Sequence, residues 1–246
     1  MRELDACGIG FVADTEGRPS RSIVTAALTG LANVKHRGAV AADARTSDGT
    51  GLLTTLPAEI FGEGNGVAML FVRGADPTAA VEAAAAQEGL EVVEWRTPPT
   101  DDAALGDLAV RTRPEILQAV FRPTPATRSE VAALAPRDDD DPLFDAASEE
   151  LERKAFRLRR RIDQTTADTY VVSCSFRTVV HKGLVAADAL ADFYLDLADD
   201  RFRAPLAIFH QRFSTNTLPT WERAQPFRML CHNGEINTIQ GNHNRM

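Results

Sequence analysis

Apolar residues occur along the chain in short runs that are separated by polar and glycine-rich segments. Residues 7–13 are small and apolar and end at a polar turn, which predicts a buried strand. Between residues 20 and 33 the apolar positions recur every three or four residues, as in an amphipathic helix capped by Ser20 or Ser22. Further strand-type runs lie at 52–56, 67–72, 90–95, 170–176, 178–181 and 204–213.

Glycines between the runs at 52–56 and 67–72 favour a hairpin at that point. Helical patterns cover 77–87, 145–163 and 187–197, and in the second of these the acidic residues come early and the arginines late. We therefore interpret that arginine cluster as a helix end and not as an anion site. The proline-rich residues 97–142 predict an irregular insertion, and its acidic run at 138–141 is typical of a solvated loop rather than a metal site.

Composition narrows the possible classes of protein. With 246 residues, 44% of them hydrophobic, the chain can bury a substantial core, and we expect one domain. Acidic residues outnumber basic ones by 35 to 27, which makes nucleic acid an unfavourable partner. The N-terminus lacks a secretory pattern, and no apolar run is long enough to cross a bilayer, so we expect a cytoplasmic protein with no membrane partner.

The three cysteines, Cys7, Cys174 and Cys231, form no CxxC pair and suggest neither a disulfide framework nor a zinc site. Cys174 lies in an expected central strand and fits a core residue. Cys7 has two interpretations. It is either a small buried side chain at a strand start or, if the bond after Ala6 is cut, an N-terminal nucleophile. Its new α-amino group, with a pKa of about 8, would then serve as the general base.

Several long motifs favour the second interpretation of Cys7. They are CGIGFVAD, HRGAVAADARTSDGTG, RTVVHKG and HQRFSTNTLPTWERAQPFRMLCHNGEINTIQGNHNRM. Together they resemble the glutaminase domain of glutamate synthase large subunits, which belongs to the class II glutamine amidotransferases. The resemblance implies an α+β N-terminal-nucleophile hydrolase fold, a four-layer αββα sandwich of antiparallel sheets. It also implies a propeptide at residues 1–6 and an amidotransferase domain at 7–246. We expect that domain to be incomplete at its C-terminal end, where the family supplies an aspartate for the substrate α-amino group.

The resemblance assigns roles to five residues. Cys7 matches the nucleophile, and Asn233 and Gly234 match the oxyanion hole, in which a side-chain amide and a backbone N–H both donate to the developing oxyanion. Arg212 matches the arginine that binds the α-carboxylate of glutamine, and Thr215 a residue that positions the same substrate. A surface ion pair is the alternative for Arg212.

Other polar residues of these motifs fit structural roles better. For Arg37 and Asp48 we favour bracing of the nucleophile loop. Cys231 and His232 are adjacent in sequence and accompany no paired ligand motif, so we expect no metal there.

The implied activity is hydrolysis of L-glutamine to glutamate and ammonia through a Cys7 thioester. In the family, a synthase domain then adds the ammonia to 2-oxoglutarate, using FMN, an iron–sulfur cluster and a small subunit. We expect no such cofactor in this chain. Two alternatives stay open: an inactive fragment with a binding or scaffolding role, and another class II amidotransferase, such as one of purine or amino-sugar synthesis.

Overall fold

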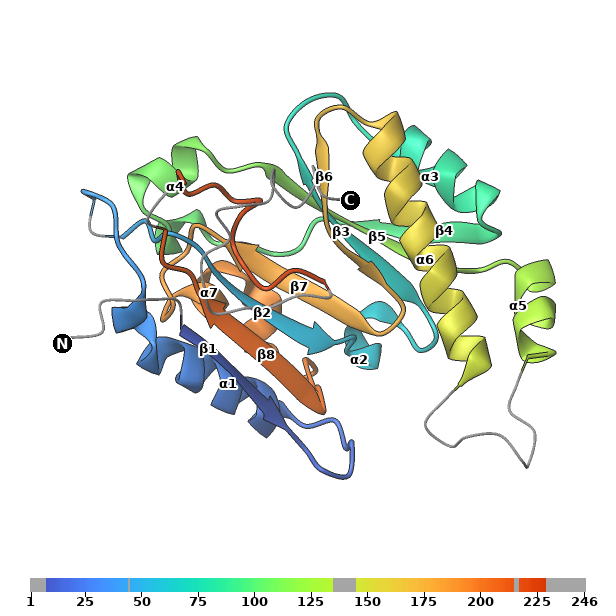
Figure 1. The fold of residues 1–246 in the computed structure, drawn as a ribbon, viewed down its shortest axis with the longest axis horizontal. Coiled ribbons are helices and arrows are strands. Elements are labelled where there is room, and N and C mark those ends of the chain that lie inside the picture. The colour runs from blue at the N-terminus through green and yellow to red at the C-terminus, as the bar shows by residue number, and fades with distance from the viewer. Residues whose placement is uncertain (1–7, 44, 135–144, 215–216, 229–246) are drawn as a thin grey trace, which may run out of the picture.

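The computed structural model describes residues 8–43, 45–134, 145–214 and 217–228. These residues form two four-stranded sheets in which every pairing is antiparallel (Figure 1). The first sheet has the order β1 (Gly8–Ala13), β8 (Leu206–Gln211), β2 (Thr50–Thr55) and β7 (Thr178–Gly183). The second has the order β4 (Leu90–Arg96), β5 (Glu115–Pro123), β3 (Gly66–Val72) and β6 (Thr169–Ser175).

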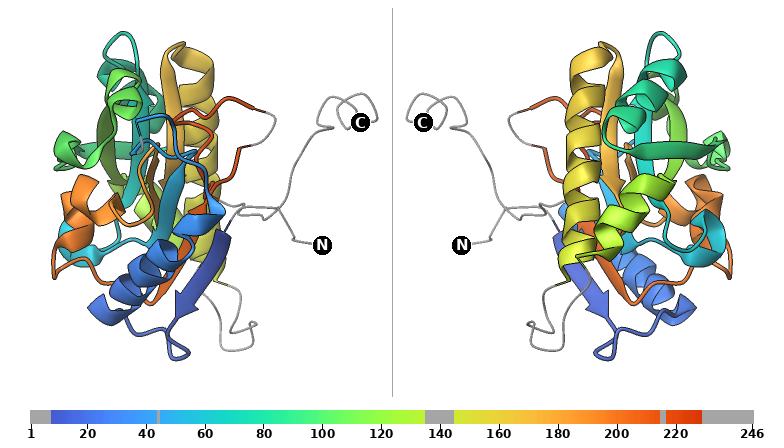
Figure 2. Two further views of the ribbon diagram at one scale, coloured as in Figure 1. Left: turned by 90° about the vertical axis from the view of Figure 1, so that its left-hand side faces the viewer. Right: turned by 90° about the vertical axis from the view of Figure 1, so that its right-hand side faces the viewer.

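Helices pack on both sheets. Helix α1 (Arg21–Asn33) packs on β1 and β8, and its first turn is capped by the Ser20 hydroxyl, which accepts a hydrogen bond from Ile23 N at 3.4 Å. Helices α3 (Thr78–Gln87) and α6 (Ala146–Thr165) cover the second sheet (Figure 2). The shorter helices are α2 (Ala58–Phe61), α4 (Asp107–Arg111), α5 (Pro125–Ala132) and α7 (Leu190–Phe193). Single 3-10 turns occur at Lys35–Arg37, Asp102–Ala104 and Leu195–Ala198.

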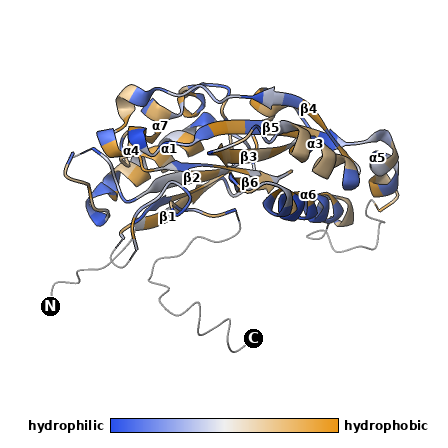
Figure 3. Cartoon of the chain, turned by 90° about the horizontal axis from the view of Figure 1, so that it is seen from above, coloured by the Kyte–Doolittle hydropathy of each residue, from blue (hydrophilic) through white to orange (hydrophobic). Residues whose placement is uncertain are grey.

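Alternation along β3 divides the interior into two cores. Val67, Met69 and Phe71 belong to the larger core, which also contains residues of the first sheet and α1. Ala68, Leu70 and Val72 point to the other face, where they meet residues of α3 and α6. The second sheet is thus buried on both faces. Figure 3 shows the hydrophilic side of α6, opposite to the residues that it buries.

The α+β class and the antiparallel sheets confirm the fold expected from the sequence at that level. The hairpin expected between 52–56 and 67–72 is wrong, because β2 and β3 lie in different sheets and α2 stands between them. The single helix expected over 187–197 is also wrong. Tyr194 is extended, with φ −93° and ψ 94°, and bridges to Thr100, which separates α7 from the 3-10 turn that follows.

The irregular insertion expected at 97–142 needs correction as well. Strand β5 falls in this range and pairs with β3 and β4 inside the second sheet. Its prolines do not interrupt the ladder, because Pro114 precedes the strand and Pro123 is its last residue. The acidic run at 138–141 lies outside the described residues. Cys174 is fully buried as expected, but its strand, β6, is at the edge of the second sheet.

Candidate active site

Arg212 follows β8 directly, and only 9% of the residue is exposed. Its backbone N–H donates to Gly49 O at 2.8 Å. The guanidinium donates from Nη1 to Asp48 O at 3.1 Å and from Nη2 to Thr217 Oγ1 at 2.7 Å. These bonds fix a buried cation at one end of the first sheet. The surface ion pair considered from the sequence does not describe this environment.

Asp48 connects the two loops that meet at this end of the sheet. Its carboxylate Oδ2 accepts a hydrogen bond from Ser214 N at 2.7 Å, while its carbonyl accepts from Arg212. Burial raises the pKa of Asp48, and the Ser214 N–H and the Arg212 charge oppose that rise. Residues 48–49 thereby hold residues 212–214 by both side chain and backbone.

Strand β1 begins beside this arginine. Gly8 pairs with Gln211 in the antiparallel register, and Thr50 of β2 pairs with Gln211 from the other side. Gln211 Oε1 accepts a hydrogen bond from Thr50 Oγ1 at 3.0 Å, and its Nε2 donates to Arg212 O at 3.0 Å. A Cβ on Gly38 would lie 1.9 Å from Gln211 Nε2, so a larger residue there would displace the Gln211 side chain from these hydrogen bonds. The HRG, SDGTG and HQR motifs therefore meet at one end of the first sheet.

Of the predicted site residues, Arg212 is described and lies at this end of the sheet. Cys7, Thr215, Asn233 and Gly234 lie outside the described residues, as do Cys231 and His232. Gly8, the neighbour of Cys7, stands opposite Gln211, the neighbour of Arg212. Gln211 and Thr50 were missed from the sequence, although both sit inside motifs that were recognised there.

Lys182 and Glu152 are two further buried charged residues that the sequence did not single out. Lys182 of β7 is fully buried, and its Nζ donates to Glu222 O and Ala224 O, both at 2.8 Å, and to Tyr170 Oη at 3.3 Å. A lysine on the apolar strand 178–183 was the only sequence signal for it. These carbonyls belong to residues 221–228, which we call the covering segment.

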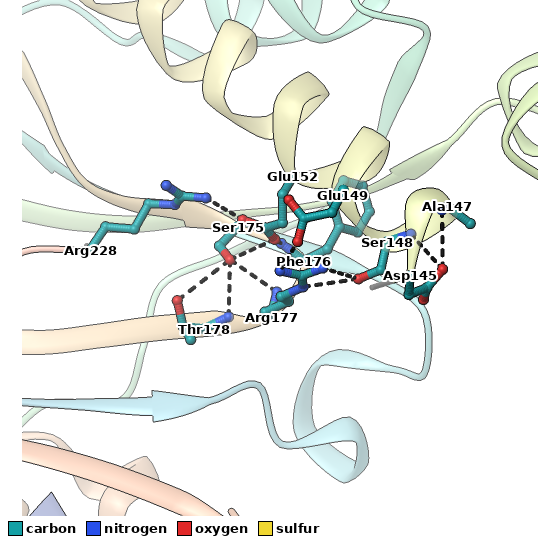
Figure 4. Close-up of polar contacts among 10 residues, drawn as sticks. All are labelled: Asp145, Ala147, Ser148, Glu149, Glu152, Ser175, Phe176, Arg177, Thr178 and Arg228. Atoms are coloured by element: carbon teal, nitrogen blue, oxygen red, sulfur yellow. Dashed lines mark hydrogen bonds and ion pairs between the residues drawn. The ribbon is translucent and has the colours of Figure 1, made fainter. Parts of the chain in front are cut away.

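Glu152 of α6 lies at the turn between β6 and β7 (Figure 4). Its Oε1 accepts hydrogen bonds from Ser175 Oγ at 2.8 Å and Phe176 N at 2.7 Å, and its other oxygen forms an ion pair with Arg228. The last residue of the covering segment is thus paired with α6. Its acidic neighbours Glu149 and Glu150 are only partly buried.

Within the described ranges, no group of three or more His, Cys, Asp or Glu side chains could hold a metal ion. In the same ranges no helix is both long and apolar enough to cross a bilayer.

The sequence matches the family described as class-II glutamine amidotransferases over residues 7–246. The chain therefore belongs to the class-II glutamine amidotransferases, which are N-terminal-nucleophile hydrolases.

Within that family, the chain is similar to proteins named as glutamate synthases. It is 37% identical to the chloroplastic ferredoxin-dependent glutamate synthase of Oryza sativa subsp. japonica over 100% of this chain and 16% of the relative. It is 37% identical to the glutamate synthase (NADPH) large chain of Azospirillum brasilense over 99% of this chain and 16% of the relative. It is 36% identical to ferredoxin-dependent glutamate synthase 2 of a Synechocystis strain over 100% of this chain and 16% of the relative. The chain thus spans 16% of the length of these relatives.

Proposed function

We propose that this chain hydrolyses L-glutamine to glutamate and ammonia, with Cys7 as the nucleophile. The observation that carries this proposal is the register of β1 on β8. It places Gly8 opposite Gln211, so that the residues next to Cys7 and Arg212 are paired in one ladder. A nucleophile and a carboxylate-binding arginine at the same end of a sheet suit a short substrate that has an α-carboxylate and a side-chain amide.

The reaction begins with removal of residues 1–6, which frees the α-amino group of Cys7. That amine takes the thiol proton, and the sulfur attacks the side-chain amide carbon of glutamine. The side chain of Asn233 and the N–H of Gly234 donate to the oxyanion that forms. The α-ammonium returns its proton to the leaving nitrogen, which departs as ammonia. Water, deprotonated by the same amine, then cleaves the thioester and releases glutamate.

Arg212 and Thr215 bind and position glutamine in this scheme. The buried setting of Arg212 supports the assignment, since a guanidinium fixed by Asp48 O and Thr217 Oγ1 is oriented before a ligand arrives. A guanidinium is also well shaped to donate two parallel hydrogen bonds to a carboxylate. Domain boundaries at 1–6 and 7–246 belong to the same proposal, as does a four-layer αββα order. The packing of α1 on the first sheet and of α3 and α6 on the second supports that order.

In a longer protein, we propose that the ammonia serves glutamate synthesis from 2-oxoglutarate in a synthase domain that works with a small subunit. The names of the relatives support this role. The described residues do not offer the cysteine ligands of an iron–sulfur cluster. Cys174 is fully buried against α6, and no other cysteine lies within the described ranges. We assign FMN and the iron–sulfur cluster to the synthase region, and the domain itself to the cytoplasm.

Intact mass spectrometry before and after treatment with 6-diazo-5-oxo-L-norleucine, a glutamine analogue that alkylates such nucleophiles, tests the proposal. We expect loss of residues 1–6 and a single adduct that is absent from the C7A variant. Release of glutamate from glutamine by the untreated protein completes the test. A chain that takes no adduct and releases no glutamate would instead support the binding or scaffolding alternative.

A further inference from the structure

The covering segment, residues 221–228, lies directly on the loop that holds Arg212. A Cβ on Gly49 would lie 2.9 Å from Ala224 Cβ, and a Cβ on Gly51 would lie 2.5 Å from Gln225 O. Gly49 has a φ of +129°, a conformation that favours glycine, and its carbonyl accepts the Arg212 N–H. Ala224 and Gln225 therefore back the residues to which Arg212 is bound.

The covering segment is fixed to both sheets. Trp221 is fully buried, packs on Gly183 of the first sheet, and stacks edge-on against Phe71 of the second sheet with a centroid distance of 5.9 Å. Glu222 pairs with Arg73 at the end of β3, with Nε and Oε1 2.9 Å apart. A third contact holds the segment at Ala224, whose carbonyl accepts a hydrogen bond from Lys182 Nζ.

Lys182 extends from β7 of the first sheet to the backbone of the covering segment. Its Nζ donates to two backbone carbonyls, Glu222 O and Ala224 O, at 2.8 Å each, and lies 4.5 Å from the ring centroid of Phe227. Backbone carbonyls in a buried segment need donors, and removing this one would leave two acceptors unsatisfied. Lys182 also pairs with Gly51 in the β2–β7 ladder, but that contact is made by its backbone and Cβ and does not need the amine. The amine itself reaches the loop at 48–51 through the carbonyls of Glu222 and Ala224.

We propose that Lys182 is a positioning residue for glutamine hydrolysis. It fixes the covering segment against Gly49 and Gly51, and thereby the orientation of Arg212. This inference rests on the proposed function, because the process that Lys182 supports is glutamine binding and attack by Cys7.

A steady-state comparison of K182M with K154M in the purified protein tests the inference. Lys154 is a partial control: it is a partly buried lysine whose Nζ donates to one backbone carbonyl, Glu88 O at 3.3 Å, on the outer side of the second sheet. We expect K182M to lower kcat/KM for glutamine by about 10-fold or more, as a displacement of under 1 Å at a site can do, and K154M by less than 2-fold. Part of the loss in K182M is a raised KM, because Arg212 is misplaced.

A positioning role predicts two further results that a purely structural role does not. K182R, which keeps donors for the two carbonyls, regains part of kcat/KM, and the rate of Cys7 alkylation by 6-diazo-5-oxo-L-norleucine falls in K182M while circular dichroism is unchanged. If K182M does not fold, K182Q and K154Q are compared in the same way. Equal kcat/KM in the two variants of either pair, with an active wild type, overturns the inference. A wild type that releases no glutamate overturns the proposed function instead.

Discussion

Arg212 is the predicted substrate-binding residue that lies within the described part of the chain. The family resemblance of the motif that begins at His210 assigned it to carboxylate binding, and the structure buries it between Asp48 and Thr217. What the sequence could not provide was its orientation, because both partners lie in loops whose path depends on the register of β2 and β8.

The R212K variant tests the assignment of Arg212. Lysine keeps the charge but loses the planar pair of donors, so we expect KM for glutamine to rise by about 10-fold or more with a smaller change in kcat. Steady-state assays of glutamate release measure both constants. The control is glutamine α-amide, which lacks the carboxylate: wild type and R212K should use it equally. A retained preference for glutamine over the amide in R212K would assign carboxylate binding to another residue.

Lys182 makes the stability of the protein depend on pH. Burial lowers its pKa to about 7, while the Glu222 carboxylate raises it and Arg159 lowers it further. Between pH 7 and the ordinary lysine pKa, the unfolded chain binds more protons than the folded one. The free energy of unfolding therefore rises with pH in that window.

Urea unfolding of wild type and K182M at pH 6, 7, 8 and 9 isolates this contribution. The difference in free energy of unfolding, wild type minus K182M, should be nearly constant below pH 7. Above it, the difference should increase by up to about 1.4 kcal/mol per pH unit. The other titrating groups, including Tyr170 beside Nζ, are present in both proteins. A difference that stays level from pH 7 to pH 9 would mean that Lys182 keeps an ordinary pKa.

Among the elements, α6 was predicted well because its signals are local. Apolar positions recur at helical spacing, Asp145 caps its N-terminus, and the acidic residues precede the arginines. The ion-pair partners of those arginines could not be predicted from the local sequence. Arg157 and Arg161 pair with Glu88, which is more than sixty residues away in the sequence. The strands were located for the same local reason, but which strands pair depended on contacts between distant segments.

The pairing of Glu152 with Arg228 joins α6 to the covering segment and can be measured by a double-mutant cycle. We expect E152Q and R228Q to show a coupling free energy of about 2 kcal/mol or more, since only 10% and 7% of these side chains are exposed. Glutamine can still accept the Phe176 N–H, so the cycle reports mainly the ion pair.

The exposed pair Arg177 and Glu149 at the same turn is the matched control (Figure 4). Its side chains are 44% and 37% exposed, and E149Q with R177Q should show a coupling below about 1 kcal/mol. Denaturant unfolding of the single and double variants gives both values. Equal coupling in the two cycles would show that Arg228 does not fix the end of the covering segment.

For the whole molecule, the sequence predicted an α+β chain of alternating helices and strands, and the family resemblance supplied the two-sheet arrangement. Periodicity could not supply it, because β2 and β3, and likewise β6 and β7, are neighbours in sequence but belong to different sheets. Strand runs this close in sequence normally suggest hairpins. Here the strands separate into two sheets because the larger core is formed by apolar residues of both sheets and of α1.

Trp221 reports on whether the two sheets and the covering segment unfold together. It is fully buried, it touches Phe71 and Gly183 in different sheets, and its Nε1 donates to Ala109 O at 3.3 Å. The only other tryptophan, Trp95, is replaced in W95F, so that fluorescence then follows Trp221 alone. Because one core includes both sheets and Trp221, we expect fluorescence and circular dichroism of W95F to give coincident urea transitions.

Combining W95F with K182M should separate these two transitions. Without the lysine, Glu222 O and Ala224 O lose their donor, and the covering segment can leave the core before the sheets unfold. Fluorescence of the double variant should therefore change at a lower urea concentration than circular dichroism. W95F combined with K154M is the control and should keep coincident transitions. If both double variants unfold in one step, the covering segment is held by Trp221 and its apolar contacts, and the lysine orients a segment that would stay in place without it.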